Sequence, residues 1–104
     1  MSHKLLIKTG LGRVLLDSDA TSLPFQILPL SDKWAVQVEG VAPDVVHEIK
    51  RVLPEVHLFY FERTKSLEII QKWWMYDIHL PQLVYDETDQ KLQIIVDSKV
   101  AYTN

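Results

Sequence analysis

Short runs of strand-forming residues recur along this chain, and at residues 33–39 and 91–97 hydrophobic and polar positions alternate with a period of two. Because successive side chains of a strand point to opposite faces, this alternation predicts strands. The predicted strands cover residues 5–9, 13–17, 33–39, 55–63, 82–86 and 91–97. Turn residues at 10–12 and 87–90 join the first two and the last two of these strands into hairpins.

Three further segments complete the strand pattern. Residues 17–22 are polar and are predicted to form a loop. Residues 23–30 are apolar but contain Pro24 and Pro29, which favours an edge strand or an extended crossing segment because proline cannot donate to a neighbouring strand. The strand at 91–97 has no proline, so we expect it to be central or to pair with another chain.

Two segments have helical spacing instead. Residues 43–53 carry apolar side chains three and four apart, with Pro43 suited to the first helical position and Pro54 ending the helix. A second helix is predicted from residue 64 or 66 to about residue 76. Its apolar positions are Leu67, Ile69, Ile70, Trp73, Trp74 and, just beyond it, Ile78.

The order of these elements predicts an α+β fold. We expect a mainly antiparallel sheet of about five to six strands with two helices packed on one face. The 104 residues match the common size of one domain, so residues 1–104 are predicted to form a single globular domain.

Composition narrows the classes of function. The chain has no cysteine, which excludes disulfides, a cysteine zinc site and a thiol nucleophile. The chain has no apolar run long enough for a membrane helix, and the apolar run near residue 1 is too short for a signal peptide. We therefore expect a cytoplasmic protein without a membrane segment. The net charge is −3 and the basic residues are scattered, which argues against a nucleic-acid partner.

Aromatic residues are the main candidates for a binding site. Trp73, Trp74 and Tyr76 form one cluster, and neighbouring side chains on the predicted helix would point about 100° apart. Phe59 and Phe61 lie on one face of the strand at 55–63. Because aromatic anchors dominate binding hot spots, the sequence predicts a protein-binding module without catalytic activity, of regulatory, inhibitor or accessory type. Its partner is expected to be another protein or a second copy of the chain, as in a homodimer.

A small enzyme is the first alternative. His57 lies on the same strand face as Phe59 and could act as an acid or base in a hydrolase or isomerase. The acids considered beside it are Glu39, Glu62 and Asp97. No serine lies between the glycines of a nucleophile elbow, so nucleophilic catalysis has little support.

A second alternative is single-stranded RNA binding, in which Phe59 and Phe61 would stack on unpaired bases. The glycine-containing consensus of RNA-binding sheets is absent. Neither a metal site nor a cofactor is predicted. A zinc-binding helix that began at His47 would need a second histidine four residues later, but that position is Arg51. Asp17 and Asp19 have the spacing that begins a calcium-binding loop, but the glycine and the distal glutamate of such a loop are missing.

Overall fold

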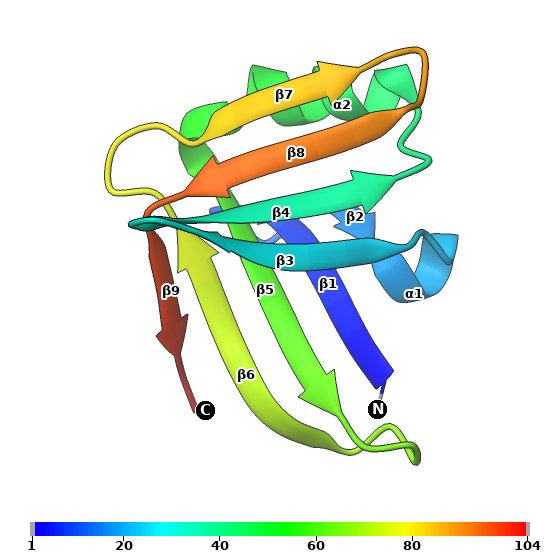
Figure 1. Cartoon of the computed structure of the whole chain (residues 1–104), viewed down its shortest axis with the longest axis vertical. Helices are drawn as coiled ribbons and strands as arrows, with labels where there is room; N and C mark the ends of the chain where they lie inside the picture. Colours follow the sequence, from blue (N-terminus) through cyan, green and yellow to red (C-terminus); the bar gives the residue numbers. More distant parts are fainter. Residues whose placement is uncertain (1, 104) are drawn as a thin grey trace.

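Two antiparallel β-sheets face each other in the computed structural model, which describes residues 2–103 (Figure 1). The strands are β1 (Ser2–Thr9), β2 (Val14–Asp17), β3 (Phe25–Leu30), β4 (Lys33–Glu39), β5 (Val56–Arg63), β6 (Ile69–Tyr76), β7 (Gln82–Asp86), β8 (Lys91–Val96) and β9 (Ser98–Ala101). The helices are α1 (Ser18–Thr21), α2 (Pro43–Arg51) and the 3-10 turn η1 (Leu53–Glu55). The sheet orders are β2-β1-β5-β6-β9 and β3-β4-β8-β7.

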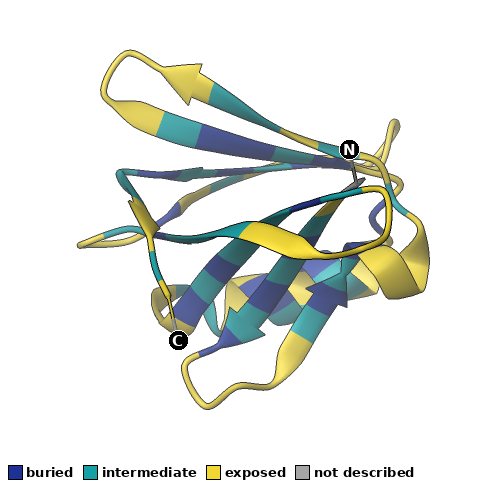
Figure 2. Ribbon diagram, turned by 90° about the horizontal axis from the view of Figure 1, so that it is seen from below, coloured by how far each residue is buried: buried dark blue, intermediate teal, exposed yellow. Residues whose placement is uncertain are grey.

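The strands of the two sheets cross at a steep angle, and the core lies between them (Figure 1). Buried and partly exposed positions alternate along the strands of the five-stranded sheet (Figure 2). Its core side chains Leu5, Ile7, Leu58 and Met75 are each 0% exposed. The four-stranded sheet contributes Val36, Val38, Leu92, Ile94 and Val96, and α2 contributes Val46 and Ile49.

Most predicted strands and the first helix are confirmed. The hairpins β1–β2 and β7–β8 form as predicted, and α2 begins at Pro43. β3 is an edge strand, in agreement with its two prolines. β8 lies between β4 and β7, so the strand without proline is central.

The second predicted helix is wrong, because residues 69–76 form strand β6. The segment is rich in isoleucine and tryptophan, which fit a pleated surface well, and β5 and β9 pair with it on its two sides. In a strand, neighbouring side chains point about 180° apart rather than 100°. Trp73 and Trp74 therefore lie on opposite faces of the sheet.

The antiparallel character and the α+β class are confirmed, but the single sheet of five to six strands is corrected to two sheets with nine strands in residues 2–103. Part of the loop predicted at 17–22 is the one-turn helix α1, in which the Asp17 carboxylate accepts from the backbone N–H of Asp19 at 2.9 Å. β9 has no counterpart in the prediction. Within residues 2–103, no helix has the length and apolar character needed to cross a membrane.

Candidate binding surface

The outer face of the five-stranded sheet carries a row of large side chains that crosses four strands. The register aligns Leu6 of β1 with Phe59 of β5, Phe59 with Trp74 of β6, and Trp74 with Val100 of β9. Residues opposite one another in a ladder point to the same side. Their chain neighbours, including Leu5, Leu58 and Met75, point into the core.

Further rings flank this row. Phe61 and His57 lie two residues on either side of Phe59, and Tyr76 lies two residues beyond Trp74, so they share its face. All of these side chains are partly exposed. We call this surface the aromatic face, and its residues are Leu6, His57, Phe59, Phe61, Trp74 and Tyr76.

The rings of the aromatic face contact one another. Trp74 lies 4.3 Å from Tyr76 between ring centroids, at an angle of 32°, and 5.7 Å from His57. The Trp74 indole N–H donates to Nδ1 of His57 at 3.1 Å. Tyr102, which follows β9, lies edge-on to Phe59 at 6.1 Å, and burial raises the pKa of its hydroxyl. These contacts hold the rings in one layer.

Lysines surround the rings. The ammonium group of Lys8 lies 5.6 Å from the centroid of Phe59, and that of Lys72 lies 5.9 Å from the centroid of Tyr102. Lys4, opposite Phe61 in the register, lies within 4 Å of two carboxylates, at 3.9 Å from Asp17 and 3.7 Å from Asp19. The face therefore combines flat apolar surface with positive charge.

Trp73 occupies the other side of β6. Its indole N–H donates to Oε2 of Glu62 at 3.3 Å. The ammonium group of Lys99 lies 4.1 Å from the centroid of Trp73 and 4.7 Å from that of Trp34 in the opposite sheet. The structure thus brings together Phe59, Phe61, Trp74 and Tyr76 among the predicted site residues, and it places Trp73 apart from them.

The surroundings of His57 differ from those of a catalytic dyad. Its hydrogen-bond partner is Trp74, and no carboxylate within residues 2–103 hydrogen-bonds to the imidazole. Glu62 contacts Trp73, while Asp97 accepts from the backbone N–H of Ile78 at 3.2 Å. Over the same residues, no three histidine or acidic side chains gather at a position that could hold a metal ion.

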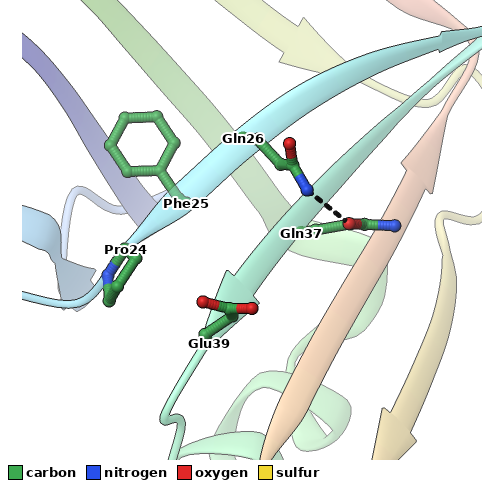
Figure 3. Close-up of a pocket in the computed structure, with 5 residues that line it drawn as sticks. All are labelled: Pro24, Phe25, Gln26, Gln37 and Glu39. Atoms are coloured by element: carbon green, nitrogen blue, oxygen red, sulfur yellow. Dashed lines mark hydrogen bonds between the residues drawn. The ribbon is translucent and has the colours of Figure 1, made fainter.

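A depression of about 240 Å³ lies over the other sheet (Figure 3). Gln26 donates to Gln37 at 3.0 Å and Gln37 donates to Gln93 at 2.8 Å, so the amides satisfy one another across three strands. The ring of Phe25 points away from the two glutamines in Figure 3 and lies edge-on to Tyr60 at 6.0 Å. Glu39 completes the lining with Pro24. This arrangement offers hydrogen bonds but no pair of groups suited to catalysis.

Sequence reasoning missed the contribution of β1 to the aromatic face. The alternation of Lys4, Leu6 and Lys8 was visible in the sequence, but their pairing with β5 depends on which strands become neighbours. Tyr102 was missed because it joins the face only through the unpredicted strand β9.

Comparisons of the chain with protein-family models, with curated proteins and with solved structures each found no match. The geometry itself offers a layer of partly exposed rings for stacking or apolar contact. It also offers two ammonium groups, from Lys8 and Lys72, beside those rings.

Proposed function

We propose that this chain is a small binding module without catalytic activity, which docks another protein through the aromatic face. The observation that carries the proposal is the row of Leu6, Phe59, Trp74 and Val100 across four strands, flanked by further partly exposed rings. Aromatic side chains lose little conformational freedom on binding, and clusters of them supply most of the free energy at protein interfaces.

The arrangement of the helices supports this choice of surface. α2 places Val46 and Ile49 in the core, and α1 lies beside β1 (Figure 1). The aromatic rings therefore keep part of their area open to solvent. Large exposed apolar patches with polar residues around them are typical of protein interaction sites.

Native mass spectrometry of the chain purified from its own host tests the proposal. We expect a stoichiometric complex with a second protein, and we expect Trp74→Thr to weaken it by at least about 2 kcal/mol, which is about 30-fold in Kd. Threonine keeps the strand propensity of the position. Thermal melting of each variant checks that the chain remains folded.

Trp73→Thr is the matched control, because it removes the same side chain from the opposite face of the same strand. We expect this variant to keep the complex at the temperature of the assay. A complex that is lost with Trp73→Thr and kept with Trp74→Thr would contradict the proposal, as would a chain that remains monomeric. A homodimer that depends on Trp74 would identify a second copy as the partner.

Single-stranded RNA binding is a second candidate, favoured by the positions of Lys8 and Lys72 beside the rings. In this function Phe59 and Phe61 would stack on bases while the ammonium groups contact phosphates. Titration with a uridine oligonucleotide at low salt tests it. Binding that weakens steeply as salt is added would support RNA binding, and no binding at low salt would exclude it.

A further inference from the structure

A depression of about 300 Å³ lies at one end of the aromatic face, between its rings and the turn that joins β1 to β2. Phe59 and Trp74 form its apolar wall, and Lys8 and His57 supply its charged and polar groups. Gly10 and Gly12 of the turn complete the border. Among residues 2–103, no aspartate or glutamate lines this depression.

The hydrogen bond from Trp74 determines how His57 presents its ring. An indole N–H can only donate, so Nδ1 of His57 must accept, and the neutral ring carries its proton on Nε2. A Cβ atom at Gly10 would lie 3.8 Å from Nε2, which shows that Nε2 faces the turn. His57 and Lys8 lie opposite one another in the register of β1 and β5 and both line the depression, so their side chains border the same space.

We propose that the docking segment of the partner protein is an extended acidic stretch with alternating apolar residues. This inference rests on the proposed function. One carboxylate binds the Lys8 ammonium and the His57 Nε2–H in the depression, and the next apolar side chain packs on Phe59 and Trp74. His57 and Phe59 are two residues apart on β5, so the two subsites lie about 7 Å apart, which is the spacing of alternate residues in an extended peptide.

Charge favours an acidic protein segment over a nucleic acid as the occupant. The chain has a net charge of −3, which at long range repels a nucleic acid with many phosphates more strongly than a segment with one or two carboxylates. Lys4 already lies within 4 Å of two carboxylates, whereas the ammonium group of Lys8 lies over the ring of Phe59 and borders the depression. One lysine matches one carboxylate, whereas non-specific affinity for nucleic acid rests on many phosphate contacts.

The test uses two synthetic peptides, each with two repeats, and the intact chain. The acidic peptide repeats Phe-Ser-Glu-Ser and the basic peptide repeats Phe-Ser-Lys-Ser, so both present the same rings with opposite charge. Binding is followed by the backbone amide shifts of the ¹⁵N-labelled chain. We expect the acidic peptide to bind at least about tenfold more tightly than the basic one, with the largest shifts at His57, Phe59 and Trp74.

Two charge-reversal variants complete the test. Lys8→Glu should weaken binding of the acidic peptide by about threefold to tenfold, since each exposed charge pair contributes modestly. Lys33→Glu, which changes the net charge equally from an exposed position on β4, should leave binding within about twofold. Both variants are checked by thermal melting, and Lys8→Gln serves if Lys8→Glu does not fold.

The inference would be overturned if both peptides bound equally, or if neither bound at 5 mM, which is about the weakest range that such titrations detect. It would also be overturned if Lys8→Glu and Lys33→Glu had equal effects, or if only uridine oligonucleotides bound. If a protein complex depends on Trp74 but is unaffected by Lys8→Glu, the proposed function stands and the acidic segment is wrong. If neither substitution affects any complex, both proposals fail.

Discussion

Removing the negative charge of Asp19 should destabilise the fold in a pH-dependent way. Asp19 in α1 accepts two hydrogen bonds from the Arg63 guanidinium at the end of β5, at 2.8 Å and 3.0 Å. This pair ties α1 to the five-stranded sheet across 44 positions of sequence. The Arg63 side chain is 9% exposed and that of Asp19 is 43% exposed.

The magnitude follows from this partial burial. Hydrogen bonds to charged groups contribute about 1.5–3 kcal/mol in buried sites, whereas exposed ion pairs contribute about 0.2–1 kcal/mol. Because solvent screens the half-exposed carboxylate of Asp19, we expect Asp19→Asn to lower the free energy of unfolding by about 1–2 kcal/mol. For a domain of this size that lowers Tm by about 5–10 °C.

The stability that the Asp19 carboxylate contributes should be lost only as the pH falls. The hydrogen bonds from Arg63 are the main cause that lowers the pKa of Asp19 below its usual value of 3.8, and the charges of Arg63 and Lys4 add to it. Stability from a lowered carboxyl pKa is fully present above the unfolded pKa, near 4, and is lost as pH falls through the folded pKa. The difference between wild type and Asp19→Asn should therefore stay constant from pH 7 to 5 and shrink below pH 4.

Thermal melting followed by circular dichroism at pH 7, 5, 4 and 3 measures this difference. Asp32→Asn is the control, because Asp32 lies exposed in the turn between β3 and β4 and the substitution changes the charge equally. The reasoning would be refuted by a loss of Tm that is the same at pH 3 as at pH 7. Equal losses for the two variants at pH 7 would refute it as well.

Three further substitutions test the packing and the backbone conformation. Met75→Ala in β6, where Met75 is 0% exposed, should lower the unfolding free energy by about 2–5 kcal/mol in urea denaturation, and a loss below 1 kcal/mol would contradict the buried strand. Gly40 and Gly12 both have positive φ, at 79° and 89°, so Ala at either should destabilise by about 1–2 kcal/mol. A Cβ at Gly40 would also lie 3.2 Å from Leu23, so Gly40→Ala should lose more than Gly12→Ala, and equal losses would show that Leu23 moves freely.

Local patterns predicted most strands because alternation is a property of a single segment. The same patterns misassigned 69–76, where isoleucine and tryptophan suit either a wide helical stripe or a strand. Which of the two forms depends on partners far along the chain, since β5 and β9 satisfy the backbone of β6 on both sides. The number of sheets also depends on which distant strands pair, and the periodicity of a single segment carries no information about that.

The candidate site was predicted in its residue types and only partly in its geometry. The sequence correctly predicted that Phe59 and Phe61 share a face, because both lie on the predicted strand β5 and are two residues apart. Trp74 and Tyr76 join them through the register of β6 on β5, which sequence could not supply. The lysines were taken as scattered, because Lys8 and Lys72 are neighbours of the rings only in the folded sheet.

The charge of the aromatic face bears on the choice between a second copy and a different protein as the partner. Two copies that met with the Lys8 side of this face at a two-fold axis would bring the positive charge of Lys8 toward the same charge of the partner copy. Like charges about 4 Å apart repel by about 4 kcal/mol at an effective dielectric constant near 20. Burying the rings would have to exceed that repulsion. A partner with carboxylates beside its apolar residues would gain from Lys8 instead, so we expect a heteromeric complex rather than a homodimer.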